Sequence, residues 1–292
     1  MMPLPKQNRH PWTNRMIQTR RARPNQLLRW LVLVFPAWVA AAGIAAPAPD
    51  AGQPVSVQEQ KERVARGHSF LIGLFDPELS LLPEFRGSKT YWLFHDNYLA
   101  ARTLAQAQPE LSERIRVALA RFGVTNSGKI EIVFNEARQP LPFRAYQLTN
   151  VARIHEKLVR TEALTTNLLT RWEAYADLLL LASMVQADSA PQQARSCFDR
   201  AAAMWDGNGF KDHAAQANGI YATYKLALYL IAAERLKIQP PHSRAVLDRL
   251  LAMQSKEGGW ITDYKQDRPV GVANVETTCL AILALQTTRH ER

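Results

Sequence analysis

Near its C-terminus the chain reads Val275-Glu-Thr-Thr-Cys-Leu-Ala-Ile-Leu-Ala-Leu285, which is apolar on nearly every side of a helix. A helix that is apolar all round is buried among other elements. Three other stretches share this composition, namely Asp96–Ala107, Arg171–Gln186 and Tyr221–Ala233. Each of these helices alternates along the chain with a more polar, amphipathic one. This alternation is typical of helical hairpins that have one inner and one outer member.

The spacing of these segments predicts the architecture. The more polar helices are expected at Val57–Leu74, Pro109–Phe122, Pro191–Trp205 and Ser243–Gln254. The inner helices begin near residues 96, 172, 221 and 275, with spacings of 76, 49 and 54 residues. The first spacing is longer than the others, and a β insertion within it accounts for the difference. Lys129–Asn135 alternates like a strand, and 146–164 contains β-branched runs. We expect an all-α fold over residues 57–292, an α/α-toroid-like array of helical hairpins with a small β-hairpin insertion at about 125–165.

One turn in this pattern resembles a known family. The segment Leu250-Leu-Ala-Met-Gln254-Ser-Lys-Glu-Gly258-Gly259-Trp260 is similar to the QW repeat of squalene–hopene cyclases, with Gln254, Gly258 and Trp260 matching its Gln-x-x-x-Gly-x-Trp core. The same layout before a Glu-Thr-Thr helix is seen in protein prenyltransferases and α2-macroglobulin thioester domains. The resemblance implies an α/α-toroid of the terpenoid cyclase and prenyltransferase superfamily. The Asp-x-Asp-Asp, Asp-Asp-x-x-Asp and Cys-Gly-Glu-Gln motifs of its members are absent, so the resemblance implies a divergent function.

The N-terminal segment accounts for most of the basic charge. Residues 1–46 hold seven Lys and Arg and no Asp or Glu, so the net charge of +10 leaves +3 for the rest of the chain. An uncharged apolar run, residues 30–49, follows this basic flank in the order of a secretory signal. Residues 1–46 are therefore interpreted as a signal peptide or an N-terminal membrane anchor, and 47–56 as a linker. A buried core helix is the third interpretation, which the preceding cations disfavour.

This distribution of charge also bears on location and partners. We expect an exported protein, periplasmic or extracellular. Residues 30–49 are either removed with a cleaved signal peptide or remain as a membrane anchor. No nucleic-acid partner is expected, because the basic residues do not form a patch on the folded domain. The oligomeric state is left open.

Candidate site residues lie at the starts of the inner helices. Successive inner helices of such an array run parallel, so their N-termini meet at one end. Acids there are candidate catalytic groups, namely Asp96, Glu173 and Glu276, although an acid in the first turn also serves as a helix cap. Aromatic and polar neighbours are candidate ligand-binding residues, because aromatic faces and carboxyls suit sugars. They are Tyr91, Trp92, His95, Asn97, Tyr224 and Trp260.

Three function classes remain open. The first is a binding protein that holds a glycan, peptide or lipid in a concave aromatic and acidic cleft. The second is a carbohydrate-active hydrolase or lyase, for which Glu173 and Asp177 share one helical face as a carboxylate pair. Such a pair also forms ordinary ion pairs, here with Arg171 or Arg160. The third, a terpenoid or prenyl enzyme, is disfavoured by the missing motifs, and whether the protein is an enzyme is undecided.

No cofactor or metal is expected. Residues Asp206–His213 contain several oxygen ligands, but Phe210 occupies a ligand position of the calcium-loop pattern, so a capped loop is favoured. Cys197 and Cys279 lie on predicted helices, where two free buried thiols or, outside the cytoplasm, a disulfide are the alternatives.

Overall fold

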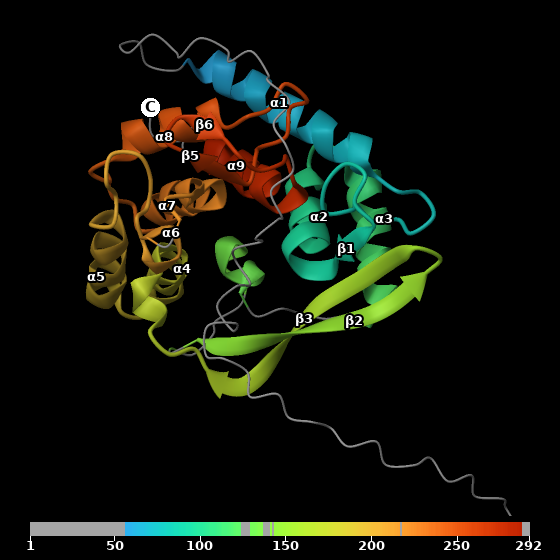
Figure 1. The fold of residues 1–292 in the computed structure, drawn as a ribbon, viewed down its shortest axis with the longest axis horizontal. Helices are drawn as coiled ribbons and strands as arrows, with labels where there is room; N and C mark the ends of the chain where they lie inside the picture. The colour runs from blue at the N-terminus through green and yellow to red at the C-terminus, as the bar shows by residue number, and fades with distance from the viewer. Residues whose placement is uncertain (1–55, 124–128, 137–140, 142, 217, 288–292) are drawn as a thin grey trace, which may run out of the picture. The chain divides into compact units, whose positions relative to one another are not determined.

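Twelve helical segments make up most of the part of the chain described by the computed structural model, residues 56–123, 129–136, 141, 143–216 and 218–287 (Figure 1). They are α1 (Val57–Leu74), η2 (Leu93–Tyr98), α2 (Leu99–Leu104), α3 (Pro109–Arg121), η3 (Ile130–Phe134), η4 (Trp172–Ala174), α4 (Ala176–Gln186), α5 (Pro191–Ala202), α6 (His213–Gln216), α7 (Thr223–Arg235), α8 (Ser243–Ala252) and α9 (Val275–Thr287). The strands are β1 (Thr90–Trp92), β2 (Arg144–Ile154), β3 (Lys157–Leu168), β4 (Tyr221–Ala222), β5 (Asp263–Lys265) and β6 (Arg268–Pro269).

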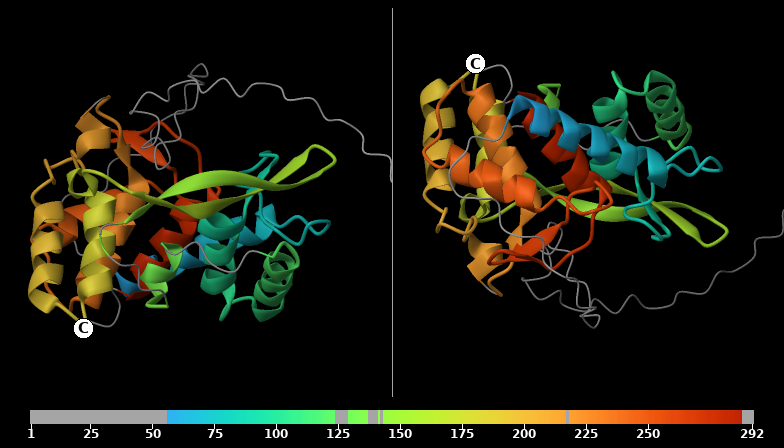
Figure 2. Two further views of the ribbon diagram at one scale, coloured as in Figure 1. Left: turned by 90° about the horizontal axis from the view of Figure 1, so that it is seen from below. Right: turned by 90° about the horizontal axis from the view of Figure 1, so that it is seen from above.

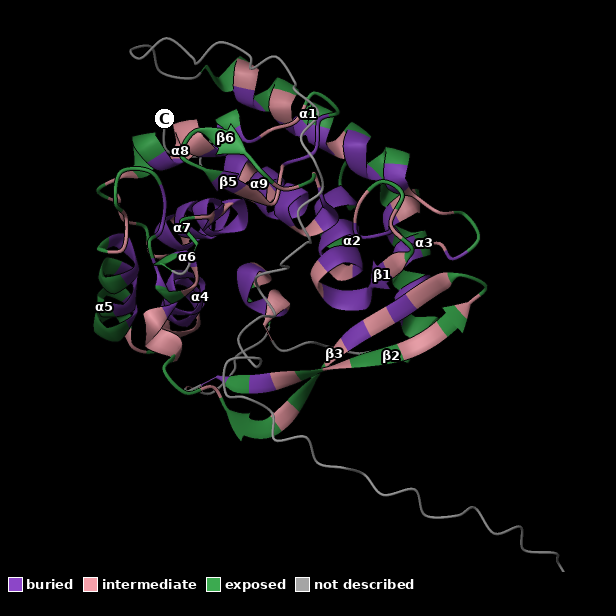
Figure 3. Ribbon diagram, viewed as in Figure 1, coloured by how far each residue is buried: buried purple, intermediate pink, exposed green. Residues whose placement is uncertain are grey.

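The apolar helices form the core. Helix α9 contacts α2 on one side and α7 on the other, and α7 contacts α4. Figure 3 shows these four helices buried over most of their length, whereas α5 and α8 expose one face. The sequence explains this difference, because Leu178–Ala182 and Leu226–Ala233 carry apolar side chains in every direction.

Each core helix contacts a more polar helix. The contacting pairs are α2 with α3, α4 with α5, α7 with α8, and α9 with α1. The last pair joins the first helix of the described chain to the final one, and Figure 2 shows α1 running alongside α9. Gly67 permits this close approach, since a Cβ there would lie 2.9 Å from side-chain atoms of Ile282 and Trp260.

Two small sheets accompany the helices. Strands β2 and β3 form an antiparallel hairpin, and β1 adds to it in parallel through Thr90 opposite Leu158. The second sheet has the order β4-β5-β6 and connects the start of α7 to the loop before α9. Of the residues that the structure describes, 52% are helical and 19% lie in strands or bridges. The expectation of an all-α fold is therefore wrong, because short strands formed by long-range pairing leave little periodic signal in the sequence.

The insertion also differs from the expected hairpin. Lys129–Asn135 was expected as a strand but contains the 3-10 helix η3, with Glu131, Ile132 and Val133 all buried. Asn135 ends this turn in the left-handed region at φ 60°, which asparagine tolerates better than most residues. The alternation of polar and apolar residues over 129–135 therefore belongs to a buried tight turn. The strands of the hairpin are β2 and β3, which follow it in the chain. The expected leader and most of the linker, residues 1–55, lie outside the described residues.

Candidate functional site

The first turns of the core helices bring acids from distant segments together. Asp96 lies in η2, which contacts the start of α9 where Glu276 sits. Glu84 joins them because its backbone carbonyl accepts a hydrogen bond from the Val275 N–H at 3.0 Å. The three carboxyl groups interact electrostatically with one another. They form what we term the carboxyl cluster, Glu84, Asp96 and Glu276.

Asp96 is the most deeply buried member of the carboxyl cluster. Its exposed fraction is 0%, and neither carboxyl oxygen makes a hydrogen bond with a residue that the structure describes. Burial, reinforced by the charges of Glu84 and Glu276, raises its pKa well above the ordinary value, while the nearby Glu276 backbone N–H partly offsets the shift. Its surroundings therefore favour the neutral form of the Asp96 carboxyl.

Glu276 differs from Asp96 in remaining partly exposed to solvent. It does not cap its own helix, because the Asn274 side chain takes that role and accepts from the Thr277 N–H at 2.9 Å. Burial raises the pKa of Glu276 to about 8, with Lys129 opposing the shift and Glu84 and Asp177 adding to it. Glu276 is thus a partly exposed residue whose pKa of about 8 leaves its carboxyl mostly protonated at neutral pH.

A second group of buried charges adjoins the carboxyl cluster. Lys225 on α7 lies 2.5 Å from Asp212 Oδ2 and 3.7 Å from Asp177 Oδ1, and these two acids raise its pKa despite burial. Asp212 also accepts the N–H groups of Ala214 and Ala215, which caps α6, and that of Ala176 at the start of α4. This network is internally satisfied, so its role is to hold α4, α6 and α7 together.

Tyr224 connects this network to the site. Its hydroxyl donates to Asp177 Oδ2 at 3.3 Å, and the Tyr224 ring lies within electrostatic range of Glu276. Tyr224 is buried, and burial raises its pKa well above the ordinary value. Its phenol therefore remains a neutral hydrogen-bond donor.

Lys129 and His95 add a cation and an imidazole. Lys129, just before η3, interacts with Asp177 and Glu276, and burial lowers its pKa against their attraction. His95 Nδ1 contacts the Glu162 carboxylate from β3, and both side chains keep some exposure. Burial and the Lys129 charge lower the pKa of His95 to about 3, while the contact with Glu162 favours a proton on Nδ1. A neutral ring with a protonated Nδ1 leaves Nε2 as an acceptor.

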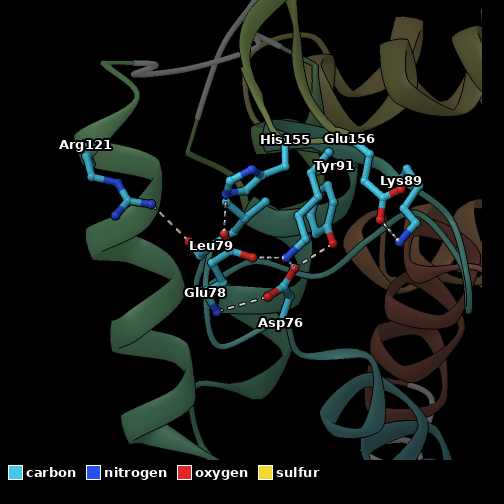
Figure 4. A network of polar contacts seen from close by, with 9 residues as sticks. Asp76, Glu78, Leu79, Lys89, Tyr91, Arg121, His155 and Glu156 are labelled. Carbon is cyan, nitrogen blue, oxygen red and sulfur yellow. Dashed lines mark hydrogen bonds and ion pairs between the residues drawn. The ribbon is translucent and has the colours of Figure 1, made fainter.

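The other predicted site residues lie elsewhere. Tyr91 precedes Trp92 on β1 and points the opposite way, so its hydroxyl donates to Asp76 Oδ2 at 2.7 Å in a network with Glu78 and Lys157 (Figure 4). Asn97 is fully buried and bonded to Leu82 and to the Trp92 carbonyl.

Trp260 and Glu173 are not members of the carboxyl cluster, although the Trp260 backbone N–H donates to Thr278 Oγ1 of α9 at 2.9 Å. Trp260 is fully buried, and its indole N–H donates to the Leu250 carbonyl at 2.8 Å. Glu173 lies in η4 within electrostatic range of Cys197 on α5. Trp92 is close to the site but buried, and its ring contacts His95 and the Arg160 guanidinium, so it offers no open face to a sugar.

The sequence pattern did not single out Glu84 or Lys129, because both lie outside the regular helices. The sequence pattern presents Asp177 only as the partner of Glu173, yet it is the acid of α4 that interacts with Glu276. Its burial at 1% could have been anticipated, since Leu178–Leu181 beside it are apolar all round. Such an acid needs a partner, and Lys225, equally buried in an apolar helix, is the complementary signal.

Two further features are the loop at Asp206–His213 and the two cysteines. Among the described residues, no group of three or more His, Cys, Asp or Glu side chains has a geometry suited to a metal ion. Asp206 instead accepts from Asn208 N–H, Gly209 N–H and the Tyr221 hydroxyl, which is a capped loop. Cys197 and Cys279 are both free and buried.

Comparison with known protein families, characterised proteins and solved structures finds no match for this chain. None of the helices in the described residues is long and apolar enough to cross a bilayer. Residues 30–49, the expected span, are not among them.

Proposed function

We propose that the protein binds a glycan at the carboxyl cluster, with Glu276 as the principal contact. The observation that carries this proposal is the partly exposed Glu276 carboxyl, which no described residue engages in a hydrogen bond or ion pair. A protonated carboxyl offers one O–H donor and one C=O acceptor, which complements a sugar hydroxyl.

The accessible groups around Glu276 support a polar ligand. His95, Glu162 and Lys129 are partly exposed, and all three are polar or charged. An acyl chain would take these polar groups out of contact with water, which costs free energy and disfavours the lipid alternative. A hydroxyl-rich ligand can form hydrogen bonds with them in place of water.

The test is calorimetric titration of the full-length protein with a panel of soluble neutral and uronic-acid oligosaccharides. We expect binding to at least one, and a roughly tenfold loss of affinity for Glu276→Gln, which keeps the shape but removes the acid O–H. Glu173→Gln is the matched control, because Glu173 lies near Cys197 instead. Binding that is equal in both variants, or absent from the whole panel, would remove the proposal.

We also propose that the chain is exported, with residues 1–46 acting as a cleaved signal or an anchor. The support is the basic flank followed by the uncharged run 30–49. Sequencing the N-terminus of the protein recovered from cell fractions distinguishes the two. A cytoplasmic protein that retains Met1 would contradict both.

A further inference from the structure

We infer that the bound glycan is acidic and that Arg160 binds its carboxylate group, as a uronic acid would supply. This inference rests on the proposed glycan-binding function and names the class of ligand. It follows from a row of three side chains, Trp92, Arg160 and Asn150, which the sheet of β1, β3 and β2 places opposite one another (Figure 1).

The pairing of the strands fixes the order of this row. Trp92 of β1 lies opposite Arg160 of β3, and Asn150 of β2 lies opposite Arg160 on the other side. Residues that lie directly opposite one another share a face of the sheet. The pairing of β2 shifts between Asn150 and Ala152, and irregularities of this kind are frequent beside functional sites because they redirect a side chain.

Two contacts hold the Arg160 guanidinium in one orientation. Its central carbon lies 4.8 Å from the centre of the Trp92 ring, and its Nε donates to Asn150 Oδ1 at 3.0 Å. Trp92 is buried and its ring also contacts the His95 ring at 4.8 Å, so the indole that supports the guanidinium is itself held in place. An arginine that is oriented before binding loses less side-chain entropy when an anion arrives.

The outer edge of the guanidinium is available to a ligand. Arg160 is partly exposed, and its Nη1 and Nη2 groups make no hydrogen bond or ion pair with any residue that the structure describes. Two parallel N–H groups at this edge match the two oxygens of a carboxylate. A single sugar hydroxyl can accept from only part of this fork and brings no charge to balance it.

Two acids near Arg160 leave this edge open. Glu162 follows two residues later on the same face of β3, but one of its carboxyl oxygens contacts His95 Nδ1 and the other is buried. Glu84 lies within electrostatic range of Arg160, and burial raises the pKa of Glu84, which favours its neutral form. The guanidinium charge is therefore left for a ligand to balance.

Backbone hydrogen bonds connect this row to the carboxyl cluster. The Glu84 N–H donates to the Thr90 carbonyl at 2.9 Å, and the Glu84 carbonyl accepts from the Val275 N–H at 3.0 Å. Glu84 therefore joins β1, the first strand of the row, to the first turn of the helix that carries Glu276. An oligosaccharide of several units is able to contact Glu276 with one unit and Arg160 with another.

The experiment compares two ligands that differ only at the carboxyl group. The full-length protein is titrated calorimetrically with a uronic-acid oligosaccharide and with the same oligosaccharide after its carboxyl groups have been reduced to alcohols. We expect the wild type to bind the acidic form more tightly. Arg160→Gln should lower the affinity for the acidic form roughly tenfold or more and leave that for the reduced form nearly unchanged, which also shows that the variant is folded.

Further variants test how the guanidinium is held. Arg160→Lys keeps the charge but lacks the planar fork, so it should recover only part of the affinity for the acidic form. Asn150→Asp places a carboxylate beside the guanidinium that competes with the ligand, so it should weaken binding of the acidic form alone. The matched control is Arg153→Gln, which removes an exposed cation from the same sheet and should bind both forms as the wild type does.

The outcomes separate this inference from the proposed function. Binding of neutral glycans alone, an equal loss for both forms in Arg160→Gln, or the same loss in Arg153→Gln would overturn the assignment of Arg160 and leave the proposed function intact. Failure to bind any glycan would remove the proposed function and this inference with it.

Discussion

The buried carboxyl of Asp96 faces the backbone of Glu276, so an acid from near the start of the fold lies against the first turn of its last helix. Neither residue caps its own helix: no side-chain cap bond precedes η2, and Asn274 caps α9. Neither carboxyl therefore stabilises the start of its own helix, and long-range packing places the two together. Such an arrangement is more typical of a functional site than of helix capping.

Replacing Asp96 by Asn should stabilise the protein at neutral pH. The pKa of Asp96 is raised in the folded state, so wild-type stability falls as pH rises above the unfolded value of about 3.8. The Asn side chain has a similar shape and cannot ionise. We expect a gain in the free energy of unfolding at pH 7 that shrinks toward pH 4, as measured by denaturant unfolding. A variant that is less stable at pH 7 would show that ionised Asp96 stabilises α9.

The Glu276→Gln substitution should flatten the pH dependence of stability. Glu276 faces Lys129, Glu84, Asp96 and Asp177, and its pKa of about 8 exceeds the ordinary value of 4.5. The folded state therefore binds the proton more tightly, and stability is lost as pH rises from about 4.5 to about 8. Melting temperatures of the wild type and of the variant should diverge across this interval. Parallel curves would contradict the raised pKa.

Lys225→Met should be strongly destabilising. Loss of the ammonium group leaves Asp177 and Asp212 buried together without their cation. We expect a loss of about 3–5 kcal/mol in the free energy of unfolding. The matched control is Lys211→Met, whose side chain is exposed and should change stability little. Similar behaviour of the two variants would show that the buried network contributes nothing.

The Tyr91→Phe substitution tests whether Tyr91 has a structural role or contacts the ligand. The substitution removes the hydrogen bond to Asp76 and should cost about 1–2 kcal/mol of stability. Glycan affinity should not change, since Tyr91 faces the network with Lys157 and not Glu276. A clear change in affinity without loss of stability would place Tyr91 at the ligand after all.

Gly258→Ala should disrupt the turn before Trp260. Gly258 has φ +97°, and a Cβ there would lie 2.4 Å from the Arg66 carbonyl oxygen of α1. Backbone strain and the clash act together, so we expect a loss of about 2 kcal/mol or more in unfolding experiments. Gly207→Ala also has a positive φ but meets nothing within 4 Å, which makes it the control for strain alone.

The parts of the fold that were predictable are those with strong local signals. Helix α1 has the expected bounds because it starts at the Ser56 cap, and α9 begins at Val275 as expected because a long apolar run starts there. Strands β1, β4, β5 and β6 are two or three residues long and pair with distant segments, so no period reveals them. The meeting of Asp96 and Glu276 follows from helix direction alone. The position of Lys129 near Glu276 could not be predicted in this way, because it depends on the turn η3, which the sequence pattern presents as a strand.

The contact of α1 with α9 bears on how the chain is made. Because α1 emerges first and its partner last, the Gly67 face of α1 stays uncovered until synthesis has passed residue 287. The acid pair is likewise incomplete until then, since Glu276 arrives with α9. A form of the protein that ends before α9 therefore loses the contact of α1 with α9 and the candidate site in the same event.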